Sequence, residues 1–479
     1  MAKTTRIKNA AWVAAWDASA NTHMYLRDAD VVFTGNTIDF VGKDYQGAAD
    51  QEIDGRELFV MPGLVNLHCH PYNQPLFKGF REELGSKKLY MSALYDCMAV
   101  YRTDDEGRQA CAEYALSELL LSGVTTVTDL SFNFPGWLDW LDKSGLRAYV
   151  APMYCSATWY TEDGNKVKYN WDEAAGQRAF DDAIKLIEQA EKHPNGRMSG
   201  MLLPAQIDTC TEELLRDSLD LAEEKGWPIQ IHAGQSIVEF HEMTRRHGVT
   251  PIQWLHQIGF LRPDAIIGHA ILIDTHSWVY WPTKDDLSLL ADTGTSIAHC
   301  PVVFSRYGMI MESLGDYIRS GVNMGIGTDT HPHNMLEEIR TAAILSRVAD
   351  KQTYGISTAE VFHAATAGSA KALGRDDIGR LAPGAKADIV LVDTAHPAML
   401  PVRDPLRSLI YTAAERAVRD VYVDGVKVVG DGEVLTLDIK TAGEKLEEAQ
   451  QRAEKGVPAL HSGNLTAEQV SPLSLRVGD

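Results

Sequence analysis

Histidine and aspartate side chains follow several apolar segments, in positions that suit the metal ligands of an enzyme. His68 and His70 come directly after the apolar segment 59–67. Because alternate residues of a strand face the same side, both imidazoles can reach one ion. Single polar residues end four later apolar segments: His232, His269, His299 and Asp329. A lone buried histidine is usually structural, but five such segment ends together predict a centre for Zn²⁺ or a neighbouring first-row ion.

These segments belong to a repeated pattern of apolar strand, polar loop and amphipathic helix. Eight strands are predicted, at 59–67, 124–130, 147–154, 201–206, 228–232, 265–269, 296–299 and 323–327. Helical segments with apolar residues at three-and-four spacing lie between them, for example 104–122 and 174–192. The pattern predicts a (β/α)8 TIM barrel, in which the carboxyl ends of the strands carry the active site.

Short strands flank the barrel pattern at both ends of the chain. Strand segments broken by turns occupy 6–41, and strand and hairpin character returns at 387–392 and 418–433. Because neither piece can form a stable unit alone, we expect both to join in one small β-sandwich. The predicted fold is α/β: residues 1–60 and 381–479 form the sandwich, with a terminal helix and tail, and 61–380 form the barrel.

The composition limits the partners of the chain. Lys and Arg number 45 against 66 Asp and Glu, which gives a net charge of -21. So acidic a surface disfavours nucleic acid and anionic membranes. No stretch approaches the ~20 apolar residues of a membrane span, and no secretory leader is apparent, so we expect a cytoplasmic protein. The six cysteines have no paired spacing, which argues against a disulfide framework or a cysteine zinc site.

The sequence resembles the amidohydrolase superfamily, and within it the branch of cytosine, guanine and triazine deaminases and chlorohydrolases. The resemblance covers nearly the whole chain and rests on five motifs: MPGLVNLHCH at 61–70, GH at 268–269, AHCP at 298–301, GIGTD at 325–329 and GAKADIV at 384–390. It implies that His68, His70, His232 and Asp329 hold the metal. It also implies that His269 polarises the attacked group or orients the water.

The resemblance also bears on the number of ions. Members with two metals carry a carboxylated lysine at the end of strand four, whereas this chain reads LLPAQI at 202–207. We therefore expect one divalent ion per subunit, with Zn²⁺ preferred and Co²⁺, Fe²⁺ or Mn²⁺ as alternatives.

Two positions depart from the deaminases of that branch. Those enzymes carry a glutamate three residues after the strand-five histidine as a proton shuttle, and this chain has Gln235 there. An amide neither gains nor loses a proton near neutral pH; Glu239 is the nearby acid if the alignment is displaced. The deaminases also have Ser-Asn shortly after the strand-seven motif, where this chain has Val302-Val303-Phe304.

Two further segments, GFREE at 79–83 and THPHN at 330–334, look most like the phenylurea hydrolase and molinate hydrolase group. That resemblance implies hydrolysis of a urea, carbamate or thiocarbamate carbonyl bond by a metal-activated water. Asp329 is the expected general base, His269 stabilises the oxyanion, and Gln235 acts by hydrogen bonding. The alternative is a deaminase or chlorohydrolase of a nitrogen heterocycle. A barrel without chemistry is a further alternative, against which the complete ligand set argues.

Aromatic residues are frequent in the loops that follow these strands. They predict a pocket for an apolar or aromatic small molecule. The expected pocket residues are Tyr72, Phe77, Trp159, Tyr160, His299, Phe304 and Tyr307. Exposed aromatic residues also mark subunit interfaces, so Trp159 and Tyr160 are equally compatible with packing in the homo-oligomer that we expect.

Overall fold

The computed structural model describes residues 2–80 and 88–478, so Arg81, Glu82 and Glu83 of the GFREE segment lie outside the described residues. Its centre is a ring of parallel strands: β8 (Leu64–Cys69), β9 (Val124–Ser131), β10 (Arg147–Tyr154), β13 (Met198–Gly200) with β14 (Leu203–Pro204), β15 (Ile229–Ala233), β16 (Ala265–His269), β17 (Ser296–His299) and β18 (Asn323–Ile326). Two single bridges close the ring, Leu202 to Ile229 and Cys69 to Asp329. This is the expected (β/α)8 barrel.

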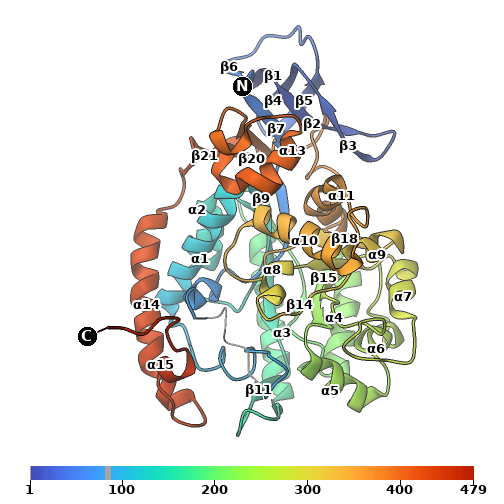
Figure 1. Ribbon diagram of the computed structural model, residues 1–479, viewed down its shortest axis with the longest axis vertical. Helices are drawn as coiled ribbons and strands as arrows, with labels where there is room; N and C mark the ends of the chain where they lie inside the picture. Colours follow the sequence, from blue (N-terminus) through green and yellow to red (C-terminus); the bar gives the residue numbers. More distant parts are fainter. Residues whose placement is uncertain (1, 81–87, 479) are drawn as a thin grey trace.

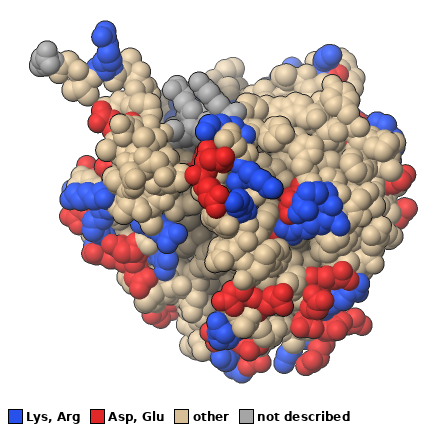
Figure 2. Space-filling view, turned by 90° about the horizontal axis from the view of Figure 1, so that it is seen from below, with Lys and Arg blue, Asp and Glu red and all other residues tan. Residues whose placement is uncertain are grey.

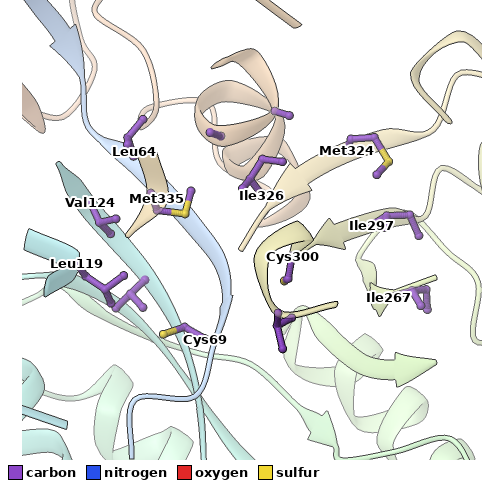
Figure 3. Close-up of a cluster of buried hydrophobic side chains, with 14 of the residues drawn as sticks. Leu64, Cys69, Leu119, Val124, Ile267, Ile297, Cys300, Met324, Ile326 and Met335 are labelled. Carbon is purple, nitrogen blue, oxygen red and sulfur yellow. The ribbon is translucent and has the colours of Figure 1, made fainter. Parts of the chain in front are cut away.

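Helices follow the strands and cover the outside of the ring (Figure 1). The longer ones are α1 (Asp105–Leu121), α3 (Glu173–Glu191), α4 (Glu212–Lys225), α5 (Ile237–His247) and α10 (Met335–Asp350). Shorter ones are α2 (Trp137–Ser144), α6 (Pro251–Gln257), α7 (Asp286–Thr293), α8 (Pro301–Ser305), α9 (Leu314–Arg319), α11 (Thr358–His363) and α12 (Ser369–Ala372). Their apolar faces pack on the strands, and Figure 3 shows Leu119 of α1, Val124 of β9 and Met335 of α10 among these buried side chains.

Strands from both ends of the chain form two further sheets. One has the order β5-β4-β1-β6 and the other β22-β21-β20-β19-β7-β2-β3. Their bounds are β1 (Thr4–Ala10), β2 (Trp12–Asp17), β3 (Thr22–Leu26), β4 (Ala29–Thr34), β5 (Thr37–Gly42), β6 (Gln51–Asp54), β7 (Leu58–Pro62), β19 (Ile389–Asp393), β20 (Val418–Val423), β21 (Val426–Gly430) and β22 (Glu433–Val434). Ile7, Phe33 and Leu391 belong to one buried cluster that joins both sheets. The two ends of the chain therefore share one β unit, at the top of Figure 1.

The predicted strand 59–67 is two strands in the structure. β7 pairs with β19 and β2 in the terminal sheet, whereas β8 pairs with β9 in the barrel. The break falls at Gly63, where a Cβ atom would lie 2.0 Å from Oγ1 of Thr125. Only glycine allows the backbone to pass so close at this point, and the continuous apolar run hides the break from periodicity.

The C-terminal helix is longer than the charged surface helix that the sequence predicts at 444–455. Helix α14 spans Ile439–Leu460 and buries Leu446, Ala449, Ala453 and Val457. These residues share a cluster with Ala110 and Cys111 of α1, so α14 packs along the barrel instead of lying free on the surface. A short helix, α15 (Ala467–Val470), follows it. Within residues 2–80 and 88–478, no helix combines the length and the apolar character needed to cross a membrane.

A small hairpin stands apart from the barrel sheet. Strands β11 (Ala157–Tyr160) and β12 (Lys168–Trp171) pair antiparallel in the segment after β10. In Figure 1 the label β11 lies at the lower edge of the molecule, opposite the terminal β unit. The hairpin therefore belongs to the face at which the barrel strands end. Figure 2 views the molecule from that lower side and shows acidic and basic side chains interspersed on it.

Candidate active site

Four histidines and one aspartate converge at the carboxyl ends of the barrel strands. Nε2 of His70 lies 3.3 Å from Oδ1 of Asp329 and 3.2 Å from Nε2 of His232. Nε2 of His68 lies 3.6 Å from the same carboxylate oxygen, and Nε2 of His269 lies 3.9 Å from Oδ2. All five side chains are buried. The residues come from β8 and the position directly after it, from β15 and β16, and from the turn after β18, so only the closed barrel brings them together.

The cluster fits a divalent metal ion. Two overlapping sets, His68 with His232 and His269, and His68 with His70 and Asp329, each place their ligand atoms within 4.8 Å of one another. Within the part of the chain that the structure describes, Nε2 of His68 and both ring nitrogens of His269 are buried without a hydrogen-bond partner. Buried polar atoms are normally paired, so the unpaired Nε2 of His68 beside the other ligand atoms fits a metal ligand. Imidazole with carboxylate is a donor set that zinc and its neighbours accept.

Outer hydrogen bonds orient three of these imidazoles. Nδ1 of His70 bonds the carbonyl oxygen of Leu130 at 2.7 Å. Nδ1 of His232 bonds the Ala205 carbonyl, and Nδ1 of His68 bonds Oε1 of Gln230. Because each acceptor requires a proton on Nδ1, the lone pair of each ring is left on Nε2, which faces the centre.

The electrostatic environment also suits ligands. Burial lowers the pKa of His70 to about 4, and burial together with the other imidazoles lowers the pKa of His232 well below its ordinary value. Both rings are therefore neutral, as a metal ligand must be. Burial alone would raise the pKa of Asp329, but its contact with His68 and the surrounding imidazoles lower it well below the ordinary range. Asp329 is ionised in this setting.

A cavity of about 370 Å³ opens at this cluster, within the range of small-molecule pockets. His70, His232 and Asp329 form its polar end. Aromatic residues and methionines form much of the remaining wall: Tyr72, Tyr90, Met91, Tyr95, Met98, Phe132, Met153, Trp159, Trp278, Phe304, Tyr307 and Met309. Among the described lining residues, Asp329 is the only acidic or basic side chain apart from the histidines. The cavity therefore suits an uncharged, apolar molecule.

The structure places three of the expected pocket residues elsewhere. Phe77 is buried in the cluster between α1 and α14. Tyr160 is 42% exposed, whereas its neighbour Trp159 lines the large cavity. His299 ends β17 but lines a smaller cavity with Ile271 and Phe304, and burial lowers its pKa to about 3. Of the expected set, Tyr72, Trp159, Phe304 and Tyr307 do line the large cavity.

Gln235 lies in the cavity wall beside a partner that sequence reasoning missed. Its Nε2 donates to Oε1 of Gln206 at 2.6 Å, and both amides line the cavity. Glu239 is not among the lining residues that the structure describes. Its carboxylate accepts the backbone N–H groups of Gly234 and Gln235, at 2.6 and 3.1 Å, and burial raises its pKa to about 8. Glu239 thus holds the loop after β15.

Gln230 was also missed by sequence reasoning. It lies two residues before His232 in β15, and it is fully buried. Residues two positions apart in a strand face the same side, so a polar residue two positions before a metal ligand in an apolar strand is a signal that could have identified Gln230.

The comparisons with known proteins agree with this geometry. A family model for the amidohydrolase family matches residues 59–428. A 5-methylthioadenosine/S-adenosylhomocysteine deaminase of Natronomonas pharaonis is 28% identical over 432 residues, which cover 89% of this chain and 94% of the relative. A 5'-deoxyadenosine deaminase of Methanosarcina mazei is 28% identical over 460 residues, covering 95% and 99%.

Two solved structures support the fold. The atrazine chlorohydrolase of Arthrobacter aurescens, complexed with zinc, has a TM-score of 0.79 at 23% identity, covering 93% of this chain and 100% of that one. An adenosine deaminase of Xanthomonas campestris, with bound zinc, has a TM-score of 0.77 at 22% identity, covering 94% and 98%.

Fold, site and relatives together define a metal-dependent hydrolase that acts on carbon–nitrogen bonds. The chain belongs to the amidohydrolase family, whose model matches most of its length. This confirms the superfamily resemblance. The relatives from Natronomonas and Methanosarcina are both named as deaminases, so they favour the alternative function over urea or carbamate cleavage. The finer resemblance to phenylurea and molinate hydrolases stays a prediction.

Proposed function

We propose that the chain hydrolyses the carbonyl bond of an uncharged urea, carbamate or thiocarbamate with apolar substituents. The observation that carries this proposal is the amide pair of Gln235 and Gln206 in the cavity wall. Among the described lining residues, Asp329 is then the only carboxylate that can exchange protons with a substrate. The proposed reaction is one that a single acid-base group can serve.

The metal ligands in this proposal are His68, His70, His232 and Asp329, with one ion per chain and zinc as the preferred ion. Such an ion lowers the pKa of water toward neutrality and polarises a carbonyl group. Asp329 accepts the proton of the attacking water and delivers it to the leaving amine, while a thiolate leaving group needs little protonation. His269, whose two ring nitrogens have no hydrogen-bond partner among the described residues, stabilises the negative charge that develops on the carbonyl oxygen.

The amides of Gln235 and Gln206 bear on the choice between carbonyl hydrolysis and ring deamination. Deamination of a heterocycle requires a proton on a ring nitrogen as well as on the departing ammonia. An amide supplies no proton near neutral pH, so Gln235 is limited to hydrogen bonding and positioning. Hydrolysis of a carbonyl group needs no proton on a ring nitrogen, so Asp329, His269 and a metal-activated water are sufficient for this reaction.

The chemistry of the cavity wall narrows the substrate further. S-Adenosylhomocysteine, named for one of the relatives, carries a carboxylate and an ammonium group. Burial of such charges requires paired side chains of opposite sign. No lysine or arginine is found among the described lining residues, whereas aromatic and methionine side chains are abundant. An uncharged substrate with an apolar group therefore suits the cavity better.

A second candidate is the deaminase or chlorohydrolase of a nitrogen heterocycle. The names of the two deaminase relatives favour it. It requires that a group other than Gln235, such as Asp329, protonate the ring.

One experiment separates the two candidates. The zinc-loaded protein is incubated with an N-aryl urea, an N-aryl carbamate, a thiocarbamate, an adenine nucleoside and an aminotriazine at equal concentrations. Amine, thiol and ammonia are measured separately, and Asp329→Asn serves as the control for contaminating activity. We expect amine or thiol release, with little ammonia. Ammonia as the dominant product would replace the proposal by the second candidate, and no turnover of any substrate would refute both.

A further inference from the structure

The hairpin of β11 and β12 carries Trp159 into the cavity wall. Trp159 is paired in register with Tyr169 of β12, and its neighbour Tyr160 faces outward. A two-stranded hairpin has little stability of its own, so its position depends on what holds it. The question is therefore which residues fix the indole ring.

Asp208 fixes both aromatic residues of this pair. Its Oδ2 accepts the indole N–H of Trp159 at 2.9 Å and the hydroxyl of Tyr169 at 2.8 Å. Asp208 follows β14, so these bonds connect the hairpin directly to the barrel. A second connection comes from α5, where Arg246 donates to the backbone oxygen of Asp208 at 2.7 Å and lies 4.6 Å over the ring of Tyr169.

The free-energy cost of burying Asp208 indicates that its hydrogen bonds to the hairpin have a functional role. The side chain has no exposed surface, and its Oδ1 has no hydrogen-bond partner among residues 2–80 and 88–478. The charge of Arg246 offsets only part of this burial, because that guanidinium also pairs with Glu242 at 2.7 Å. Burial raises the pKa of Asp208, and its bonds to Tyr169 and Trp159 only partly oppose this. A buried carboxyl group with an unpaired oxygen destabilises a fold, and such groups are concentrated at functional sites.

Tyr95 completes the geometry on the other side of Trp159. The two rings meet edge to face, with centroids 4.9 Å apart and planes at 75°. Tyr95 is itself held by a bond of 2.8 Å between its hydroxyl and Oγ of Ser236. Both residues line the cavity. Two aromatic rings are thus held at a fixed angle in the wall.

We infer that Asp208 is a positioning residue that holds Trp159, beside Tyr95, as the wall of a subsite for an aryl substituent of the substrate. This inference rests on the proposed function and specifies its substrate class. A flat aromatic ring gains stacked and edge contacts with both residues at once, and a saturated ring of similar size gains neither. Because the walls are fixed before binding, the substrate does not have to order them.

The test compares two ureas that differ only in this ring, N-phenyl-N',N'-dimethylurea and N-cyclohexyl-N',N'-dimethylurea. For the zinc-loaded wild type we expect one or two aromatic contacts to favour the phenyl compound by about 10-fold in kcat/KM, in addition to the difference between the leaving amines. Asp208→Leu removes the acceptor and should lower this ratio several-fold, mainly through KM. Differences in leaving group cancel, because the ratio is compared between variants. Asp208→Asn keeps one acceptor oxygen and should retain most of the preference.

Two further variants separate positioning from stability. Trp159→Phe keeps an aromatic ring but lacks the N–H group, so it should lose the preference for the phenyl compound as Asp208→Leu does. This variant also provides the test if Asp208→Leu fails to fold. Tyr169→Phe removes the second donor to Asp208 and is the matched control, for which we expect the ratio to stay near wild type. Melting temperatures show which variants are folded.

Two results would overturn the inference: a folded Asp208→Leu protein with the wild-type ratio, or an equal loss in Asp208→Asn. Binding of phenol and cyclohexanol, followed by ligand-observed NMR, gives the same comparison without turnover. If neither urea is hydrolysed, the proposed function is refuted. A preference for phenol that Asp208→Leu abolishes would still support the subsite in that case. No preference for phenol in the wild type would refute the subsite itself.

Discussion

Gln230 offers the most direct test of how the protein prepares its metal ligands. His70 and His232 are oriented by backbone carbonyl groups, which no side-chain substitution removes. Of these three imidazoles, only His68 is oriented by a side chain: its Nδ1 bonds Oε1 of Gln230. The Nε2 group of Gln230 in turn donates to the Leu67 carbonyl at 3.1 Å. The substitution Gln230→Met removes the acceptor and keeps the length of the side chain. It therefore changes the orientation of His68 without removing a ligand.

The expected size of the effect follows from the burial of both residues. His68 and Gln230 have no exposed surface, so water cannot replace the lost acceptor. The Nδ1–H group then stays unpaired, at a cost of about 1–3 kcal/mol. Alternatively the proton moves to Nε2, and the ring loses the lone pair that faces the metal. Loss of such outer partners weakens metal binding about 10–100-fold, which corresponds to about 1.4–2.7 kcal/mol.

The assay is a zinc titration against a competing chelator, which gives the dissociation constant of the ion. Gln109→Met is the matched control, because Gln109 lies on α1 and its amide bonds the Pro135 carbonyl, away from the cavity. We expect a weaker zinc affinity for Gln230→Met and an unchanged one for Gln109→Met. A folded Gln230→Met protein that binds zinc within about two-fold of wild type would refute the reasoning about His68, since the expected loss is at least about 10-fold.

Further predictions concern the ligands and the acid-base group. Elemental analysis should find about one ion per chain in the wild type; near two equivalents would contradict a single site. His232→Ala should lose both the ion and activity, because a ligand is removed. Asp329→Asn should lower kcat by about 100-fold or more even where metal remains, and wild-type turnover would exclude Asp329 as the base. Gln235→Glu should not accelerate urea hydrolysis, because a second carboxylate near Asp329 adds repulsion. The same substitution should increase ammonia release from an aminotriazine. No such increase would show that the missing carboxylate does not limit deamination.

Much of the fold was accessible from the sequence because its signals are local. Apolar strands alternate with amphipathic helices over most of the chain, and this period predicts the barrel that the structure has. The barrel in turn directs attention to residues just after each strand, which identified the convergent set of His68, His70, His232, His269 and Asp329. The division of 59–67 at Gly63 was missed, because both halves are apolar and only their pairing in two different sheets separates them.

The finer chemistry of the site was decided by tertiary structure. Trp159 and Tyr160 are neighbours of similar character, and only the position of the hairpin determines which of them reaches the cavity. His299 ends a strand as His269 does, yet it lies outside the cluster of ligand atoms and lines a smaller cavity. The pairing of Gln235 with Gln206 and the anchoring of Trp159 by Asp208 join residues 29 and 49 positions apart. Periodicity reports which side of an element is buried, whereas such pairings depend on how the elements meet in space.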